Sequence, residues 1–368
     1  GDDGRQPHFE DCFLTVITGR RKSTRPFHKN PAVCPWQSKH TAGGHRRTLA
    51  NAAAMELTMI NDPKTVREML EPAIARNGGW VNTHAHADRS FTLSPEVLEL
   101  RRKCSLQQKW DALDQLKRDS TEEDFYRRFS LFFELMIRQG CTACATFVDI
   151  DPQSEDRAIK AGIRAREHYA DQLTVKFANQ TLKGVIESEA RKWFDIGAEL
   201  VDIIGGLPKR DERDFGRAAD ALDILLGTAK AQGKMVHVHV DQFNLSSEYE
   251  TEFLARKTIE HGMQGRVVAI HGISIGAHSK MYRQRLYSLL KEAGVMVVCC
   301  PTAWIDTARS EAIGPMHNSM TPVDELVPAG VTVAIGTDNV CDAMVPWSAG
   351  DMWHELQLLA TGCRFDDR

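Results

Sequence analysis

The sequence predicts an α/β protein, a (β/α)8 TIM-type barrel that follows an atypical N-terminal arm. Eight short apolar runs alternate with long amphipathic segments between residues 80 and 338. Such alternation is typical of parallel β/α units, and eight units is the number that closes a barrel. The rival, an open doubly wound sheet, usually carries a glycine-rich phosphate loop, and no G-x-G-x-x-G motif follows any of these runs.

The chain divides into an arm and a barrel. Residues 1–62 mix basic, proline, glycine and histidine residues without helix or strand period, and only FLTVIT reads as a strand. We expect this part to be an irregular arm, either loosely ordered or acting as a lid or oligomer contact. Residues 63–368 form the predicted barrel.

The barrel begins with a helix predicted over residues 63–78, with Asp62 as its candidate cap, Pro63 in its first turn and Gly78 at its end. The predicted strands are 80–86, 141–150, 173–180, 200–206, 235–240, 266–272, 294–300 and 331–338. The clearest helical segments between them are 122–140, 154–170, 212–233 and 279–294. Several of these end at a glycine, the usual C-terminal stop signal.

Bulk composition excludes some classes of function. The formal net charge is −4 and the pI about 6.4, so charge alone indicates neither a nucleic-acid nor a membrane partner. No run of about 18 apolar residues and no secretory signal peptide are present. The nine cysteines show no disulfide framework, which favours a reducing, cytoplasmic location.

Metal-competent side chains fall at the carboxyl ends of four predicted strands. They are His84, His86, His237, His239, His271 and Asp338. Barrel enzymes carry their chemistry at these ends, and side chains two apart in a strand point to the same face. Imidazoles and one carboxylate suit zinc or ferrous iron, which lowers the pKa of a bound water toward ~7. The pattern therefore predicts a metal centre that produces a hydroxide nucleophile.

A second histidine complicates the fifth strand. His237 lies on the same face as His239, one layer deeper. From strand geometry alone, either imidazole can reach a metal ion.

Three stretches resemble the amidohydrolase superfamily, and most closely its cytosine deaminase branch, which includes the N-isopropylammelide hydrolases. They are THAHADRS, AIHGISIGAHSKMY and IGTDNVCDAMVPWSAGDM. The resemblance covers about residues 80–350. It implies one divalent ion, zinc or iron, bound by His84, His86, His239 and Asp338. It also implies that Asp338 accepts a proton and that His271 acts on the carbonyl or leaving-group side of the substrate.

The resemblance also assigns substrate contacts and favours His239 over His237 as the ligand. The stretch FANQTLKG resembles a segment that reaches the substrate ring, which makes Gln180 a candidate hydrogen-bonding residue. Gln242 stands where the deaminases have a glutamate. An amide can hold a substrate but cannot transfer protons, so proton transfer falls to Asp338, His271 or Asp241.

Three other residues near the predicted barrel mouth are candidates for substrate contact, and each also has a structural interpretation. Arg89 either pairs with a carboxylate or ring oxygen of the substrate or makes a structural Arg–Asp contact. Trp304 and Trp347 follow the last two strands and either form an aromatic wall for a flat ring or pack the barrel end.

The sequence departs from the superfamily pattern in two further ways. Asn339 follows the metal-ligating aspartate where the cytosine enzymes have an acid. We expect the accessory β-sandwich of the superfamily to be incomplete in this sequence, because the first 80 residues do not resemble it and only 30 residues follow Asp338.

We therefore expect an amidohydrolase-type enzyme that hydrolyses carbon–nitrogen bonds other than peptide bonds. Its substrate would be a small nitrogen heterocycle that is deaminated or opened at a cyclic amide or amidine. Hydrolysis of a C–S or C–Cl bond on a related ring is the alternative, and a catalytically inactive, ligand-binding barrel is the alternative of another class. A homo-oligomer is an expectation from the resemblance alone.

Overall fold

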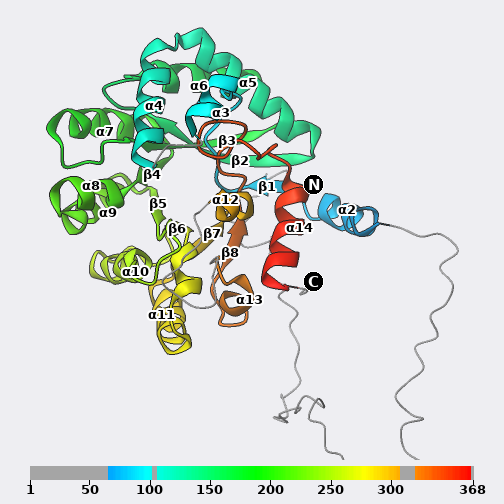
Figure 1. Ribbon diagram of the computed structural model, residues 1–368, viewed down its shortest axis with the longest axis vertical. Coiled ribbons are helices and arrows are strands. Elements are labelled where there is room, and N and C mark those ends of the chain that lie inside the picture. The colour runs from blue at the N-terminus through cyan, green and yellow to red at the C-terminus, as the bar shows by residue number, and fades with distance from the viewer. Residues whose placement is uncertain (1–64, 102–105, 307–319, 366–368) are drawn as a thin grey trace, which may run out of the picture.

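The computed structural model describes residues 65–101, 106–306 and 320–365 of the 368-residue chain. The predicted arm, residues 1–62, lies outside the described residues. In the described residues, strands alternate with helices along the chain, and the helices surround the strands (Figure 1).

Eight parallel strands form one sheet in the order β1 to β8. They are β1 (Trp80–Asn82), β2 (Cys141–Asp149), β3 (Thr174–Gln180), β4 (Ile203–Gly206), β5 (Met235–Val240), β6 (Val267–His271), β7 (Met296–Cys299) and β8 (Val333–Ile335). The first and last strands meet through a parallel bridge between Ala85 and Asp338, and the Thr83 amide donates to the Ile335 carbonyl over 3.2 Å. The predicted (β/α)8 barrel is confirmed, and each of the eight predicted strands is present.

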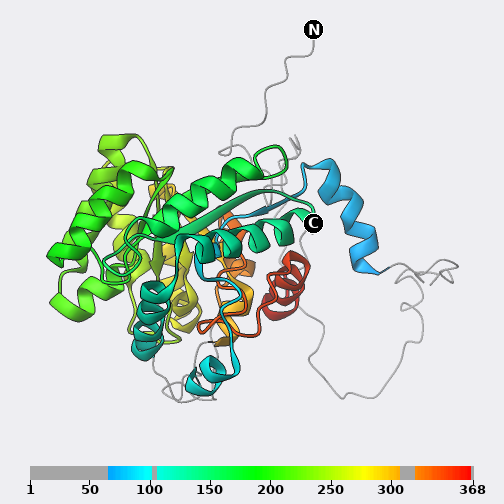
Figure 2. The same ribbon diagram turned by 90° about the horizontal axis from the view of Figure 1, so that it is seen from above.

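Thirteen α-helices and two short 3-10 helices accompany the strands in the described ranges. The α-helices are α2 (Val66–Arg76), α3 (Pro95–Arg101), α4 (Leu106–Asp119), α5 (Glu122–Arg138), α6 (Arg157–His168), α7 (Ser188–Leu200), α8 (Pro208–Phe215), α9 (Ala218–Gln232), α10 (Glu250–Glu260), α11 (Lys280–Ala293), α12 (Pro301–Asp306), α13 (Val323–Leu326) and α14 (Met352–Cys363). The 3-10 helices are η1 (Ala87–Arg89) and η2 (Ile273–Ala277). Helices α2 and α14 lie on the same side of the barrel (Figure 2), where the Arg67 guanidinium lies 5.4 Å from the Trp353 ring centroid.

Helix α5 shows how the sequence forms these outer helices. Thr121 and Asp124 make a reciprocal capping box at its start, which satisfies otherwise unpaired backbone amides. Its buried residues recur at helical spacing: Phe125, Phe129, Phe132, Phe133 and Met136. This apolar stripe faces the barrel, which is the usual arrangement for an amphipathic surface helix.

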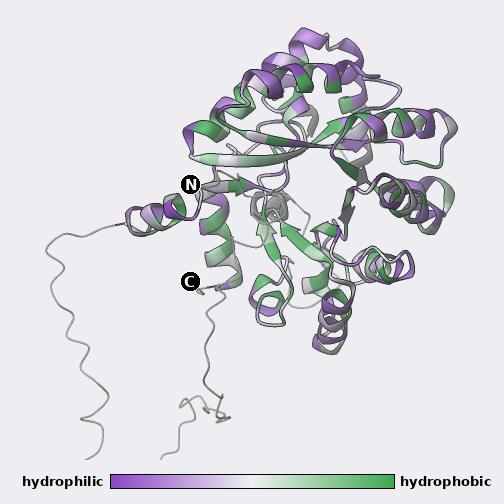
Figure 3. Ribbon diagram, turned by 180° about the vertical axis from the view of Figure 1, so that it is seen from behind, coloured by the Kyte–Doolittle hydropathy of each residue, from purple (hydrophilic) through white to green (hydrophobic). Residues whose placement is uncertain are grey.

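The hydrophobic core has an outer and an inner part. A large cluster fills the space between the strands and the helices, and a smaller one, which includes Phe147, Ile203 and Ile270, fills the barrel itself. Hydrophobic residues run along the strands while the helices carry many hydrophilic ones (Figure 3). No helix in the described ranges is both long and apolar enough to span a bilayer.

Two predicted helix boundaries were wrong. The first helix is capped by Thr65 rather than Asp62, because the Thr65 side chain and Glu68 form a capping box. The segment predicted as one helix over residues 212–233 is two helices, α8 and α9. Gly216 adopts a left-handed conformation with φ of 65° and ends α8, which a glycine does at little steric cost.

Candidate metal and active site

The strand-end residues singled out in the sequence lie close together at one end of the barrel. His84 and His86 follow β1, His239 lies in β5, His271 ends β6, and Asp338 follows β8. All five are buried, with 5% or less of each residue exposed. Four different strands therefore contribute to one cluster, as the (β/α)8 fold requires of a site at the carboxyl ends of its strands.

The ligand atoms of this cluster converge. Asp338 Oδ1 lies 3.1 Å from His84 Nε2 and 3.3 Å from His86 Nε2. His239 Nε2 lies 3.4 Å from His86 Nε2. In a tetrahedral zinc site with bonds of about 2.1 Å, neighbouring ligand atoms are about 3.4 Å apart. His84, His86 and Asp338 form one group of mutually close ligand atoms, and His239 forms a second group with His84 and His271. His84 belongs to both groups, and the three distances above match the spacing of ligand atoms around a divalent ion.

The orientation of His239 supports the same fit. Its Nδ1 lies 3.3 Å from the Gly206 carbonyl oxygen at the end of β4. A hydrogen bond from Nδ1–H to a carbonyl fixes the tautomer and leaves the Nε2 lone pair for a metal ion. Three imidazole nitrogens and one carboxylate oxygen form a donor set that suits zinc or ferrous iron.

His237 does not take part in this convergence in the same way. The His239 ring centroid lies 5.0 Å from that of His84 and 5.4 Å from that of His271. His237 is fully buried, and this burial, with a smaller contribution from His84, lowers the pKa of His237 to about 3. Among the described residues, the groups with metal-ligand spacing include His239 but not His237, which favours His239 as the β5 ligand, in line with the resemblance.

Backbone strain accompanies the site. His271 has φ of 78°, Asp338 of 55° and Asp241 of 52°. Residues other than glycine seldom adopt such values, and they cluster where function over-determines the backbone. Gly336 brings β8 close to the first strand, because a Cβ there would lie 2.7 Å from both the Cβ and the carbonyl oxygen of His84.

The charge states suit metal binding. Burial lowers the pKa of His86 and of His239 well below the usual histidine value, and electrostatic interactions with Arg89 for His86 and with His84 for His239 lower it further. Burial acts to raise the pKa of Asp338, but hydrogen bonds from His84 and His86 outweigh it and hold that pKa well below its usual range. Neutral imidazoles and an ionised carboxylate are the ligand forms.

Two glutamines predicted to contact substrate each have one buried polar atom without a hydrogen-bond partner among the described residues. Gln180 ends β3 and is 2% exposed. Buried without a hydrogen-bond partner among the described residues are Gln180 Oε1, Gln242 Nε2 and His271 Nδ1. Buried polar groups are normally paired, so atoms of this kind beside a candidate metal site are suited to a bound ligand.

The contacts of Asp241 favour a structural role over that of the alternative proton carrier. Its Oδ1 accepts the Glu250 amide over 2.9 Å and its Oδ2 accepts the Thr251 amide over 3.2 Å. Both carboxylate oxygens are thus occupied at the start of α10. The sequence could not show this, because the helix begins only nine residues later.

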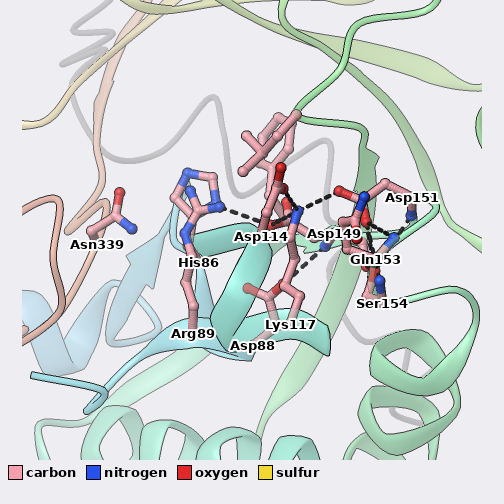
Figure 4. Close-up of polar contacts among 12 residues, drawn as sticks. His86, Asp88, Arg89, Asp114, Lys117, Asp149, Asp151, Gln153, Ser154 and Asn339 are labelled. Carbon is pink, nitrogen blue, oxygen red and sulfur yellow. Dashed lines mark hydrogen bonds and ion pairs between the residues drawn. The ribbon is translucent and has the colours of Figure 1, made fainter. Parts of the chain in front are cut away.

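Arg89 makes an Arg–Asp contact, but not with its neighbour Asp88. Its Nη1 donates to Asp149 Oδ2 over 3.0 Å, and its Nε lies 3.9 Å from Asp342 Oδ2. Of the two interpretations left open for Arg89, the structure favours the structural one. The wider network, which includes Lys117 of α4, was missed (Figure 4). Only Asp149, an acid at a strand end, gave a sequence signal for it.

The two tryptophans remain without a demonstrated role. Trp304 lies in α12, but its side chain lies outside the described part of the structure. Trp347 follows β8 and is 77% exposed, so it does not pack the barrel end.

Fold and residue cluster together define a (β/α)8 barrel with a candidate metal site at the carboxyl ends of its strands. A family model identifies it further: residues 78–365 match the amidohydrolase family. The chain belongs to this family, whose members generally bind a divalent metal ion, and the prediction of an amidohydrolase-type enzyme acting on carbon–nitrogen bonds is confirmed.

Individual relatives agree with the family. An uncharacterized protein of Haemophilus influenzae is 59% identical over 270 residues, 73% of this chain and 98% of that protein. N-isopropylammelide isopropyl amidohydrolase of Pseudomonas sp. (strain ADP) is 27% identical over 285 residues, which is 74% of this chain but only 65% of that enzyme. The structure of 5-methylcytosine deaminase from Klebsiella pneumoniae superposes with a TM-score of 0.71 at 23% identity, over 78% of this chain and 69% of that one. These relatives support the branch that the sequence resembles.

Proposed function

We propose that the protein is a metal-dependent hydrolase that acts on a carbon–nitrogen bond of a small nitrogen heterocycle, by deamination or by hydrolysis of a cyclic amide or amidine. The observation that supports it most is that His84 Nε2 and His86 Nε2 lie 3.1 and 3.3 Å from Asp338 Oδ1, while His239 Nε2 lies 3.4 Å from His86 Nε2. The names of two relatives, an isopropylammelide amidohydrolase and a pterin deaminase, point to the same substrate class.

Each residue has a defined part in this proposal. His84, His86, His239 and Asp338 would hold one zinc or iron ion, which supplies Lewis-acid activation of a water molecule. The Asp338 carboxylate accepts the proton that this water loses. The His271 imidazole, at the end of β6, polarises the carbon–nitrogen group under attack. The buried amide groups of Gln180 and Gln242 hydrogen-bond the ring.

Gln242 limits which side chains can carry protons in the proposed reaction. Its side chain is an amide, which donates and accepts hydrogen bonds but does not transfer protons at neutral pH. Proton transfer to the leaving nitrogen therefore falls to Asp338 or His271, because both oxygens of Asp241 are held by backbone amides.

A product screen tests the proposal. The metal-loaded protein is incubated with pyrimidines, triazines, pterins and cyclic ureas, and released ammonia or amine and ring opening are measured. Turnover of at least one ring that is lost in Asp338→Asn supports the proposal. Release of sulfide or chloride from thio- or chloro-substituted rings, without ammonia or amine, would replace it with the alternative reaction. Tight metal binding without turnover of any ring would favour an inactive ligand-binding barrel.

A further inference from the structure

A buried network of charged side chains lies directly beside the candidate metal ligands (Figure 4). Arg89, Lys117, Asp149 and Asp342 are all 5% exposed or less. They come from η1, α4, the end of β2 and the loop after β8. Burying so many charges is costly unless they are paired, and a buried pair contributes more to a specific geometry than to stability.

Arg89 is the member that joins these elements. Its Nη1 lies 3.0 Å from Asp149 Oδ2, and its Nε lies 3.9 Å from Asp342 Oδ2. Lys117 Nζ lies 3.6 Å from the same Asp149 oxygen, so this carboxylate faces two cations. The guanidinium thus hydrogen-bonds the end of the second strand through Nη1, while its Nε, buried without a hydrogen-bond partner, faces the Asp342 carboxylate at ion-pair distance.

We call the contacts of Arg89 with Asp149 and Asp342 the Arg89 bridge. At its Arg89 end, the bridge is joined to the backbone of the first-strand ligand His86. Arg89 follows His86 by three residues, and its own amide donates to the His86 carbonyl over 3.4 Å. Asp88, between them, accepts the Asp149 amide over 2.9 Å. The short helix η1 therefore contacts Asp149 of β2 twice, through the Asp88 carboxylate and through the Arg89 guanidinium.

On the other side, the bridge reaches the eighth-strand ligand. Asp342 Oδ2 accepts a hydrogen bond of 2.5 Å from the Asn339 amide group. Asn339 directly follows Asp338, whose backbone is held at φ of 55°. Asp342 Oδ1 accepts the amides of Met344 and Val345 over 2.8 and 3.0 Å, which fixes the loop itself.

We propose that Arg89 is a positioning residue of the metal centre: by joining Asp149 to Asp342 it fixes His86 relative to Asp338. The inference rests on the metal centre proposed above. It assigns Arg89 no substrate contact, because its charge is already faced by two carboxylates and its side chain is 6% exposed. Outer residues that orient metal ligands commonly change metal affinity when they are replaced.

Two substitutions break the bridge from opposite ends. Arg89→Lys keeps the charge, but one ammonium cannot replace a fork that spans both carboxylates. Asp342→Asn keeps the shape of the side chain but places an amide where the carboxylate accepts from Asn339 and faces Arg89. Asp342 is fully buried and hydrogen-bonded to Asn339, so its replacement changes the same contact from the other end. It therefore tests the inference even if Arg89→Lys fails to fold.

Arg283→Lys provides a matched control far from the metal ligands. Arg283 of α11 binds Glu325 of α13 through two hydrogen bonds of 2.9 and 2.7 Å. The same substitution there removes a guanidinium that makes two hydrogen bonds to one carboxylate, so it disturbs at least as many contacts as Arg89→Lys. A purely structural loss should lower the thermal midpoint of the metal-free protein and leave metal affinity unchanged.

The experiment measures zinc affinity of metal-free wild type and of the three variants by competition with a chromogenic chelator, with the thermal midpoint measured in parallel. We expect Arg89→Lys and Asp342→Asn to weaken zinc binding about 10- to 100-fold, and Arg283→Lys to stay within about twofold of wild type. Unchanged zinc affinity in both bridge variants would overturn the inference. So would a raised KM in Arg89→Lys with zinc affinity intact, since that assigns Arg89 to the substrate. If wild type itself takes up no zinc or iron, the metal centre fails and the inference fails with it.

Discussion

The Gln242 side chain presents a buried Nε2 that has no hydrogen-bond partner among the described residues. A neutral hydrogen bond contributes about 1 kcal/mol, or somewhat less than tenfold in an equilibrium. Gln242→Ala should therefore raise KM about five- to tenfold for any ring that the enzyme turns over, with kcat little changed, because the contact holds substrate and transition state alike. Steady-state kinetics at fixed metal load check this. A large fall in kcat at constant KM would instead place Gln242 in the chemical step.

For single residues, the sequence predicts the candidate metal ligands at strand ends better than it predicts contacts between side chains that are distant in the chain. His84, His86, His271 and Asp338 follow from strand periodicity and fold rules, since parallel strands bring their carboxyl ends together, while the choice of His239 over His237 came from the family resemblance. The contacts of Arg89 do not follow, because Asp149 lies 60 residues and Asp342 more than 250 residues away in the chain. Strand register and loop paths set such pairs, and neither is encoded in a local motif.

Among the helices, the break between α8 and α9 depends on one glycine. Gly216 ends α8 at φ of 65°, and a Cβ added there meets nothing within 4 Å. Gly216→Ala should therefore destabilise the fold through backbone strain alone, by about 1 kcal/mol. Gly227, inside α9, also has open space around an added Cβ but has helical backbone geometry. Gly227→Ala should stabilise the fold by about 0.5 to 1 kcal/mol.

Chemical denaturation of the two alanine variants checks this pair. Opposite signs are the expected result. Equal effects of the two substitutions would mean that the conformation of Gly216 is not what separates the helices.

The contact between α12 and α14 should make the stability of the fold depend on pH. Glu355 of α14 is buried, and its Oε2 accepts the Thr302 amide over 2.9 Å. Burial, opposed by the hydrogen bonds from Thr302, raises the pKa of Glu355 from 4.5 to about 8. The folded state therefore holds this proton more tightly than the unfolded state. Stability should fall by about 1.4 kcal/mol per unit as the pH rises from about 4.5 toward 8.

The variant Glu355→Gln isolates this effect, because an amide keeps the shape and the hydrogen bonds to Thr302 without a charge. The free energy of unfolding should depend less steeply on pH between 5 and 8 in this variant than in wild type. Glu167→Gln, at an exposed position, should leave the slope unchanged. An identical slope in all three proteins would show that Glu355 ionises as readily in the folded chain as in the unfolded one.

The whole molecule shows how far a sequence pattern determines a fold. All eight strands were predicted because each is a short, buried, apolar run between amphipathic helices. Closure of the sheet was predicted from their number, and the bridge between Ala85 and Asp338 confirms it. The predicted division at residue 62, the homo-oligomer and the cytoplasmic location stay predictions, because each depends on segments or partners beyond the barrel described here.

The central claim of the proposed function is a barrel that holds one metal ion between its first, fifth and eighth strands. The account depends on His239 rather than His237, which lies two residues earlier on the same strand face. The direct measurement is metal content per chain by elemental analysis of protein purified without added metal, for wild type, His239→Ala and His237→Ala. We expect about one zinc or iron per chain in wild type, loss of that metal in His239→Ala, and retention in folded His237→Ala. Wild-type protein that contains no metal and takes up none on soaking would contradict the metal centre, and with it the proposed hydrolase mechanism.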